Sequence, residues 1–301
     1  MKIGLIGFGS IGQRHYNNLV KRTKNVIVFS RRDDVNLPRQ VKNWREFKKC
    51  GPYDGIIIAN ETSKHVVTIK KCIALSAGWR TKALFIEKPL SHNLKNLNSL
   101  GRLLLKNRIS AFVGYCFHFF GPFIKIKKII KSGKLGRIYY LRASVGQDLK
   151  EWRPGRDYRK IYSARKNLGG GVLLDLVHDI NYPAWLLDDV LIPQRSLVKK
   201  ISDLKINTED LAESVFVGKK TGVIVSVHQD YLRIPGRRSL EIAGSKGSLI
   251  WNSSDAEDRG KMYQREINFF IGLIKGGKYF SNWDEAVWDV KNIEYLKKHG
   301  G

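Results

Sequence analysis

The sequence predicts an α/β protein with two domains. Residues 1–120 are expected to form a doubly wound parallel sheet, and residues 121–301 an α+β domain with a large, open, mostly antiparallel sheet. Three observations support this prediction. Short apolar runs alternate with helical patterns up to about residue 115, strand-like segments then follow one another with few helices between them, and 301 residues suit two domains of ordinary size.

In the first domain, apolar runs of four to six residues predict buried strands, and the longer mixed segments between them predict crossover helices. Strands are expected at residues 2–7, 25–30, 55–59, 83–86 and 110–115, and helices at residues 11–20, 63–77 and 94–107. Because crossovers between parallel strands are right-handed, this alternation builds a doubly wound sheet.

In the second domain, strands are no longer separated by regular helices. A helix is expected at residues 122–132, strands at 137–145, 213–217, 222–229, 239–243 and 248–251, and closing helices at 262–274 and 284–298. Turn sequences at 219–222 and 244–247 separate neighbouring strands, which favours an antiparallel or mixed sheet.

The charge balance is strongly basic. The chain has 54 Lys and Arg against 27 Asp and Glu, so its formal net charge is +27. Such a charge attracts nucleic acid, anionic lipid or anionic substrates. The basic residues recur along the whole chain without a run of five or six, which favours a generally lysine-rich surface. Dedicated nucleic-acid binding is therefore not expected.

Other compositional features exclude several classes of protein. No apolar run reaches 18 residues and no secretory signal pattern opens the sequence, so we expect no membrane span and a cytoplasmic location. Cys50, Cys72 and Cys116 lie far apart and form no Cys-x-x-Cys pair. Neither a metal site nor a redox pair is expected from them.

Residues Gly7-Phe8-Gly9-Ser10-Ile11-Gly12 form a Gly-x-Gly-x-x-Gly motif between a predicted strand and a predicted helix. In this context the motif is typical of a Rossmann dinucleotide-binding turn, so all six residues are expected to bind the cofactor. Gly7 permits the tight turn, Gly9 lets the backbone approach a pyrophosphate, and Gly12 lets the helix pack closely on the strand. The alternative is a glycine-rich turn that binds no ligand.

The end of the second strand indicates which dinucleotide binds, because NAD sites place Asp or Glu there to bind the ribose 2′-hydroxyl. Ser30-Arg31-Arg32 occupies that point, and the next carboxylates are Asp33 and Asp34. Arginine binds phosphate bidentately, so the sequence predicts NADP(H) in preference to NAD(H). In the alternative, both arginines point to solvent and Asp33 binds the ribose.

Several motifs occur together along the rest of the chain. They are Asn60-Glu61-Thr62-Ser63-Lys64-His65, Glu87-Lys88-Pro89, Gly169-Gly170-Gly171, Asp175-x-x-His178 and the IAGSKGSL segment at 242–249. In combination they resemble the glucose–fructose oxidoreductase/inositol dehydrogenase (Gfo/Idh/MocA) family over nearly the whole chain. The resemblance implies hydride transfer between a nicotinamide and a carbon that bears a hydroxyl or keto group, usually on a sugar ring.

The resemblance also implies the site residues. The expected catalytic residues are Lys88, Asp175 and His178, and the expected further cofactor contacts are Asn60, Thr62, His65, Glu87 and Lys88. Two positions depart from the family pattern. Asp175 precedes His178 by three residues, where several members have four, and Asn181 stands where the family has an acidic residue.

The chemistry of alcohol oxidation supports this assignment, because a protein group must take the hydroxyl proton while hydride leaves the carbon. Histidine has a suitable pKa, and the pKa of a partly desolvated lysine near a cationic nicotinamide is lowered. Asp175 and His178 are expected on one helix face, in a helix that Pro183 then interrupts. We expect His178 and Lys88 to form a proton relay that Asp175 tunes. The structural alternatives are a surface lysine, a core histidine and a helix-face charge.

Residues 150–166 are dense in arginine and aromatic side chains. Arginine binds phosphates or carboxylates and aromatic rings stack on sugars, so Trp152, Arg153, Arg156 and Tyr158 are expected to bind substrate with Asp175 and His178. This segment and residues 9–15 resemble family members associated with surface-polysaccharide and acidic-sugar biosynthesis, which implies an anionic sugar, free or nucleotide-linked. The alternative is a charged surface loop.

Two other functions are compatible with the resemblance. One is a glycosidase that uses tightly held NAD to oxidise its substrate transiently, and the other is a dinucleotide-binding regulatory protein without turnover. The presence of both Lys88 and His178 favours an enzyme over a regulator. The family resemblance also implies a homodimer or homotetramer formed through the open face of the second sheet.

Overall fold

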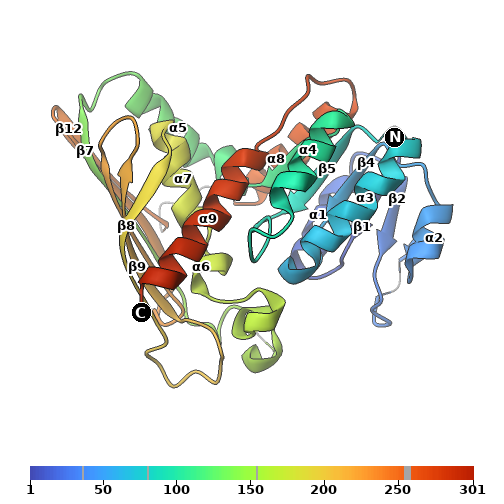
Figure 1. Ribbon diagram of the computed structural model, residues 1–301, viewed down its shortest axis with the longest axis horizontal. Coiled ribbons are helices and arrows are strands. Elements are labelled where there is room, and N and C mark those ends of the chain that lie inside the picture. The colour runs from blue at the N-terminus through green and yellow to red at the C-terminus, as the bar shows by residue number, and fades with distance from the viewer. Residues whose placement is uncertain (36, 80, 154, 254–258) are drawn as a thin grey trace. The chain divides into compact units, whose positions relative to one another are not determined.

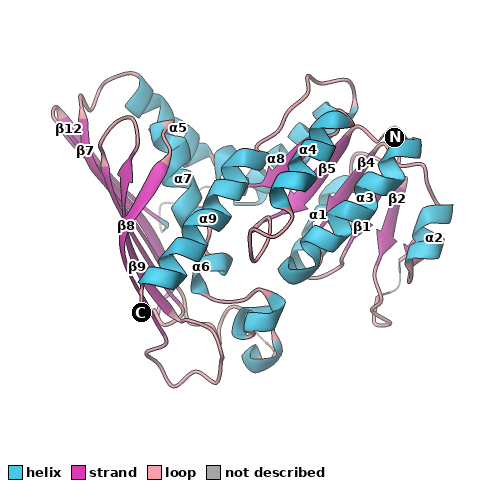
Figure 2. Cartoon of the chain, in the orientation of Figure 1, coloured by secondary structure: helices cyan, strands magenta, loops and turns pink. Residues whose placement is uncertain are grey.

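The computed structural model describes residues 1–35, 37–79, 81–153, 155–253 and 259–301 (Figure 1). Contacts between residues divide the chain into two compact units. The first contains Met1–Cys116 and Gly260–Trp288, and the second contains Phe117–Arg259 and Asp289–Gly301. Each unit combines one sheet with helices (Figure 2). None of the helices described is both long and apolar enough to cross a membrane.

The sheet of the first unit is parallel throughout. Its strands are β1 (Ile3–Ile6), β2 (Val26–Phe29), β3 (Gln40–Val41), β4 (Gly55–Ile58), β5 (Ala83–Glu87) and β6 (Ser110–Gly114), in the order β3-β2-β1-β4-β5-β6. The predicted doubly wound sheet is confirmed. The strand order reverses between β1 and β4, and ligands bind at such switch points in open α/β sheets.

Helices follow the strands of this unit. They are α1 (Ser10–Leu19), α2 (Trp44–Lys49), the 3₁₀ turn η1 (Thr62–Lys64), α3 (His65–Trp79) and α4 (Leu97–Lys106). Helix α8 (Arg259–Ile274) packs on the same sheet, although it lies far along the chain. A Cβ atom on Gly55 of β4 would come within 2.9 Å of the Phe270 ring, so only glycine allows α8 to lie this close.

The second unit contains a mostly antiparallel sheet, as predicted. Its strands are β7 (Ile138–Gly146), β8 (Leu191–Lys199), β9 (Leu211–Gly218), β10 (Ile224–Asp230), β11 (Arg237–Gly244) and β12 (Gly247–Asn252), in the order β12-β11-β7-β10-β9-β8. Among the strand pairs described in this second sheet, only β7–β10 is parallel. Residues such as Phe216 and Val227 bury one face, while Ile224 and Ile250 are exposed on the other.

The buried face of this sheet carries helices. The helical segments of the unit are η2 (Cys116–Phe119), α5 (Gly121–Lys131), η3 (Tyr158–Lys160), η4 (Tyr162–Ala164), η5 (Lys166–Leu168), α6 (Val172–Asp175), α7 (His178–Leu187) and most of α9 (Trp283–His299). A buried ion pair joins α7 to β11, because Arg238 donates to both oxygens of Asp179 at 2.8 and 2.9 Å. The pair fixes the start of α7 against the sheet.

Some elements differ from the prediction. The structure adds β3, α2 and β8, and it places Pro183 inside α7 instead of at its end. Strand β8 contains Pro193 at a break in its pairing with β9, and it lies at the edge of the sheet, where proline is tolerated. Helix α2 has only six residues, too few for a helical period to be visible in the sequence.

Candidate active site

The glycine-rich turn between β1 and α1 has the geometry of an anion-binding loop. Gly7 has a φ of +97°, and a Cβ atom there would lie 2.5 Å from the Ala59 carbonyl. A Cβ atom on Gly12 would overlap the Gly7 carbonyl oxygen. Gly9 differs, because no described atom apart from those of Gly9 and its two chain neighbours lies within 4 Å of a Cβ atom at that position. Gly9 is the N-cap of α1, and no side chain caps the helix there, which is the arrangement that an anion-binding helix start requires.

Arg32 lies against this turn at the end of β2. Its Nη1 donates to the Phe8 carbonyl at 3.1 Å, and its Nε donates to Asp34 at 2.8 Å. The hydrogen bond to Asp34 raises the pKa of Arg32. Ser30 Oγ accepts from the Arg32 amide at 3.3 Å, while Arg31 is exposed. Asp33, the alternative ribose ligand, is exposed and paired with Lys42 at 2.5 Å.

The loop after β4 is held by His65. Its Nδ1 lies 3.0 Å from the Pro89 carbonyl, and its Nε2 lies 3.0 Å from the Asn60 carbonyl. Burial lowers the pKa of His65. The Asn60 side chain donates to Thr68 at 2.9 Å, and Thr62 is buried in η1. His65 therefore joins the loops that follow β4 and β5.

Lys88 follows β5 directly and is half-buried. The preceding residue, Glu87, is buried, and its Oε1 lies 2.5 Å from Nε2 of His15 on α1. The charge of Lys88 lowers the pKa of the Cys116 thiol, although burial raises that pKa overall. The structure thus places Lys88 at the carboxyl end of the parallel sheet, in the unit that carries the glycine-rich turn.

Asp175 ends α6 in the second unit and is 3% exposed. Tyr231 donates to its Oδ2 at 2.7 Å, and Tyr162 also hydrogen-bonds to it. Burial and the charge of Asp175 raise the pKa of both tyrosines well above its usual range, so both remain donors. The triple glycine makes this possible, because a Cβ atom on Gly170 would overlap the Tyr162 carbonyl oxygen.

His178 begins α7 and is 8% exposed. Its ring meets the Phe117 ring edge-on, with centroids 5.1 Å apart. The predicted single helical stretch is divided at Leu176, where ψ is +24°, so Asp175 ends one helix and His178 starts the next. The two residues are still placed together at the break between α6 and α7.

Asn181, the departure from the family pattern, belongs to a buried polar network. Its Nδ2 donates to Asp289 at 2.9 Å, and its Oδ1 lies 2.8 Å from His118 Nε2. Burial lowers the pKa of His118 to about 3, so this histidine is neutral. An amide can donate to a carboxylate and accept from an imidazole at once, which an ionised acid cannot do.

The residues predicted to bind substrate fall into two groups in the structure. Trp152 packs edge-on against Tyr231 at 5.3 Å, and Arg153 lies over the Tyr162 ring at 5.5 Å. These two residues therefore adjoin the tyrosines that bind Asp175. Tyr158 points elsewhere, since its hydroxyl accepts from the Lys205 amide at 3.2 Å, and Arg156 is exposed.

Four residues of these sites were not predicted from the sequence: His15, Tyr162, Tyr231 and Glu266. The tyrosines are separated from Asp175 by 13 and 56 positions along the chain, so no local pattern marks them. The burial of Glu266 could have been predicted, because Glu266 lies on the same helix face as Met262 and Phe270, which are both buried. Within the described part of the chain, no group of three His, Cys, Asp or Glu side chains could hold a metal ion.

The fold and these sites define a class of protein: an oxidoreductase with a Rossmann dinucleotide-binding unit. Comparison with known families agrees. A family model described as an oxidoreductase family with an NAD-binding Rossmann fold matches residues 1–115. A second, the GFO/IDH/MocA C-terminal domain, matches residues 123–250. The chain belongs to the Gfo/Idh/MocA family, as the sequence motifs predicted.

Known relatives include polyol and sugar dehydrogenases. The chain is 23% identical to the myo-inositol 2-dehydrogenase of Thermotoga maritima, over 98% of this chain and 88% of that protein. It is 23% identical to the scyllo-inositol 2-dehydrogenase (NAD(+)) of Bacillus subtilis, over 62% of this chain and 54% of that protein.

Among solved structures, the WlbA dehydrogenase of Bordetella pertussis in complex with NADH and UDP-GlcNAcA has a TM-score of 0.82 at 15% identity. The alignment covers 100% of this chain and 96% of that one. The myo-inositol 2-dehydrogenase of Lactobacillus plantarum has a TM-score of 0.84 at 16% identity, with coverage of 100% and 97%. These likenesses show a shared fold.

The geometry of Gly9 leads to a test of the dinucleotide site. Gly9→Ala should cost at most about 1 kcal/mol of stability, the cost of a poorer helix cap. It should weaken dinucleotide binding about tenfold for each amide–phosphate hydrogen bond that the methyl group prevents, at about 1.4 kcal/mol per bond. Fluorescence titration with NADPH and NADH measures the effect.

The matched control is Gly78→Ala in α3, where a Cβ atom likewise meets no described atom within 4 Å apart from its chain neighbours and the nearby backbone of its own helix. That variant should bind dinucleotide as the wild type does. Unchanged binding in Gly9→Ala would show that the open space at the turn is not a pyrophosphate site.

Proposed function

We propose that the chain is an NADP(H)-dependent oxidoreductase that interconverts a hydroxyl and a keto group on an anionic sugar. The observation that carries the proposal is the buried Asp175, held by two tyrosine hydroxyls next to the start of α7, where His178 lies. Lys88 and the glycine-rich turn, in the other unit, supply the second half of the same reaction. The bound dinucleotide would accept or donate the hydride.

The residues of the chain handle the proton. His178 takes the hydroxyl proton as the carbon is oxidised, and Asp175 stabilises the resulting imidazolium. Tyr162 and Tyr231 support this role, since their hydrogen bonds keep the buried Asp175 carboxylate in one orientation. Lys88 orients the reacting oxygen by donating a hydrogen bond to it, while the hydroxyl proton itself goes to His178. His178 is buried and Lys88 is half-buried, and this partial exclusion of water strengthens these interactions.

The preference for NADP(H) rests on the end of β2. The Arg32 guanidinium already lies against the glycine-rich turn, and the Ser30 hydroxyl is beside it. Asp34, which pairs with Arg32, is 65% exposed, so a 2′-phosphate dianion can replace it at small cost.

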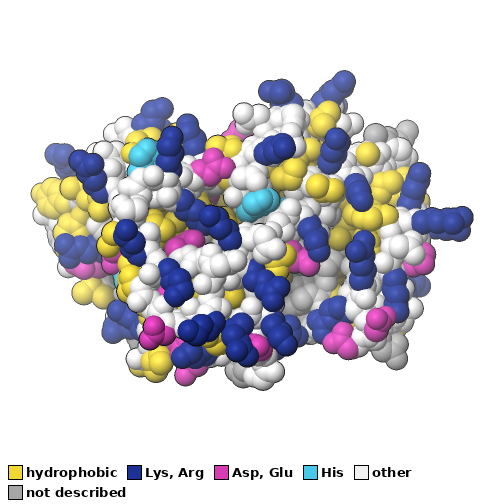
Figure 3. Space-filling model, turned by 60° about the horizontal axis from the view of Figure 1, so that its bottom comes forward, with side chains coloured by type: hydrophobic (Ala, Val, Ile, Leu, Met, Phe, Trp, Pro, Cys, Tyr) yellow, Lys and Arg dark blue, Asp and Glu magenta, His cyan; other side chains and the backbone are white. Residues whose placement is uncertain are grey.

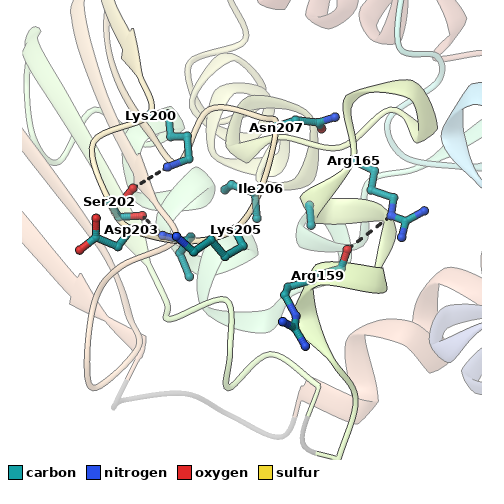
Figure 4. A pocket seen from close by; sticks show the side chains of 10 residues that line it. Arg159, Arg165, Lys200, Ser202, Asp203, Lys205, Ile206 and Asn207 are labelled. Carbon is teal, nitrogen blue, oxygen red and sulfur yellow. Dashed lines mark hydrogen bonds between the residues drawn. The ribbon is translucent and has the colours of Figure 1, made fainter.

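The anionic character of the substrate is supported by the basic side chains around residues 150–166. Arg153 adjoins Tyr162 and hence Asp175. On the other side of this segment, Arg159 and Arg165 line an open groove of about 450 Å³ together with Lys200 and Lys205 (Figure 4). Asp203 is the one acidic residue among those lining it. Elsewhere the basic residues are spread over the visible face of the protein (Figure 3).

We also propose that the exposed face of the second sheet pairs with another copy of the chain. Ile224 and Ile250 are 52% and 67% exposed there, on β10 and β12. Burying such residues against an identical face would remove apolar surface from water, in the isologous manner typical of dimers.

The roles of Lys88 and His178 lead to a kinetic prediction. Lys88→Ala and His178→Ala should each lower kcat by about a hundredfold or more, the usual contribution of acid–base catalysis. Turnover is measured as NADPH formation with a panel of neutral and anionic sugars, including inositols and UDP-GlcNAcA. Dinucleotide binding, measured in parallel, shows whether each variant has kept its first unit folded. Turnover like that of the wild type in both variants would refute the relay.

The position of Arg153 leads to a prediction about specificity. Arg153→Ala should raise KM for an anionic sugar by about tenfold or more, because a charge-assisted hydrogen bond contributes about 1.5–3 kcal/mol. KM for a neutral polyol should change little. Arg156→Ala is the comparison, since Arg156 lies in the same segment but is exposed. An unchanged KM in both variants would remove this segment from the substrate site.

A further inference from the structure

The open groove on the second unit is lined by a different set of side chains from the reaction site. Its volume of about 450 Å³ lies within the range of small-molecule sites (Figure 4). One wall comes from residues 159–165 and the other from residues 200–207. Asp175, His178 and Arg153 are not among the described residues that line it. A ligand in the groove would therefore not meet the groups proposed to handle the proton.

The short 3₁₀ turn η4 contributes to both places. Tyr162 at its start hydrogen-bonds to Asp175, whereas Ala164 at its end lines the groove. Ser163, between them, is 0% exposed. The groove and the carboxylate of Asp175 are thus served by opposite ends of one buried turn.

Hydrogen bonds tie the two walls of the groove together. The Asn207 amide donates to the Ala164 carbonyl at 3.2 Å, and the Asn207 side chain accepts from the Lys166 amide at 2.8 Å. The Lys205 amide donates to the Tyr158 hydroxyl at 3.2 Å. The walls are therefore held in place before a ligand binds, which lowers the entropy lost on binding.

A buried carboxylate anchors the loop that forms the second wall. Asp210 is 0% exposed, and it accepts from the Ile201 amide at 2.8 Å and from the Ser202 hydroxyl at 2.6 Å. Ser202 Oγ in turn accepts from the Leu204 amide at 3.1 Å. The Lys200 ammonium donates to the Ser202 carbonyl at 2.5 Å. These contacts fix the path of the loop, and hence the points from which its basic side chains extend.

The basic side chains of the groove outnumber the carboxylates near them. Arg159 is already paired, because its Nε and Nη2 donate to Asp157 at 2.8 and 2.9 Å. Three further basic side chains that line the groove form no ion pair with a described carboxylate: Arg165, Lys200 and Lys205. Asp203 is the one acidic residue in the lining, and it too forms no ion pair among the described residues. The lining therefore has three unpaired cations against one carboxylate.

The chemistry of these cations suits phosphate groups. A guanidinium can bind two phosphate oxygens at once, and ammonium groups bind them as point charges. Arg165 Nε donates to the Arg159 carbonyl at 3.4 Å, which leaves both Nη groups of Arg165 without a described acceptor. A phosphate group carries about −1.5 to −2 charges at pH 7, so three cations match a ligand with two phosphates.

A strand of nucleic acid suits the groove less well. Proteins that bind single strands supply aromatic rings on which the bases stack. No aromatic residue is among the described residues that line the groove, and the apolar side chains there include Leu204 and Ile206. The lining therefore favours a small oligophosphate.

We propose that this groove binds a small oligophosphate, with Arg165, Lys200 and Lys205 holding the phosphate oxygens. Inorganic pyrophosphate and the diphosphate of a free nucleotide present the same charged groups, so both are candidate ligands. Asp203 weakens the binding, because its carboxylate repels the anion. The site goes beyond the proposed function and does not depend on it.

Isothermal titration calorimetry with inorganic pyrophosphate tests the proposal. It is done at low ionic strength, where charges are least screened, and with saturating NADP⁺ to occupy the glycine-rich turn. The wild type should bind one pyrophosphate. The double variant Arg165→Ala/Lys205→Ala should bind it about tenfold more weakly or worse, because charge-assisted hydrogen bonds are lost.

The matched control is the double variant Arg102→Ala/Lys106→Ala, which removes one exposed arginine and one exposed lysine from α4 in the first unit. It should bind pyrophosphate as the wild type does. Equal weakening in both double variants would mean general attraction to a basic surface, and no weakening in Arg165→Ala/Lys205→Ala would mean binding elsewhere. Either result overturns the proposal, as does the absence of pyrophosphate binding by the wild type.

A variant with the opposite effect guards against misfolding as an explanation. Asp203→Asn should tighten pyrophosphate binding by about twofold to fivefold, because it removes a repelling charge at an exposed position. Unchanged or weaker binding would contradict the place of Asp203 in the site and overturn the proposal.

Two further ligands identify what the groove holds. If ADP binds more tightly than pyrophosphate and depends on Arg165 and Lys205 in the same way, the ligand is a nucleotide, and the reverse order indicates the inorganic anion. A single-stranded oligonucleotide that binds more tightly than both, with the same dependence, would overturn the proposal in favour of nucleic acid. Lack of turnover on every sugar would contradict the proposed function and leave these results intact.

Discussion

The first unit depends on the close approach of α1 to β1, which only glycine at position 12 permits. This approach directs the start of α1 at the open space beside Gly9. It also carries His15, one turn further along the same helix, onto the Phe85 ring at 4.8 Å and onto Glu87. One packing contact therefore sets both the dinucleotide turn and the buried cluster that precedes Lys88.

In the second unit, different contacts fix the positions of Asp175 and His178. Asp175 is held by tyrosines from distant segments, and the start of α7 is fixed by the buried pair of Asp179 and Arg238. The bidentate geometry of that pair limits rotation of the helix, and therefore of His178 at its first position. Asn181, which stands in place of an acidic residue, also holds α7 in position, because its side chain hydrogen-bonds to both His118 and Asp289.

Local patterns predicted much of this architecture. The strands of the parallel sheet are continuous apolar runs, so they could be recognised from sequence. The Gly-x-Gly-x-x-Gly spacing is typical of one strand–turn–helix connection, so the dinucleotide turn could be recognised as well. Strand β8 could not, because its proline and exposed side chains resemble a loop until a neighbouring strand pairs with it. The partners of Asp175 and the pairing of Glu87 with His15 depend on tertiary contacts. The burial of Glu266 follows from the helical period of α8, but its raised pKa also depends on the charge of Glu87 at the end of β5, which the sequence does not place beside it.

Dinucleotide binding is the property on which the proposed chemistry rests, and a parallel fluorescence titration with NADPH and NADH measures it most directly. Saturable binding of both, tighter for NADPH, is expected, and Arg32→Ala should remove the preference by weakening NADPH alone. Tighter binding of NADH would contradict the assignment of Ser30 and Arg32 to a 2′-phosphate. Absence of binding by either, with no dinucleotide retained through purification, would contradict the oxidoreductase itself.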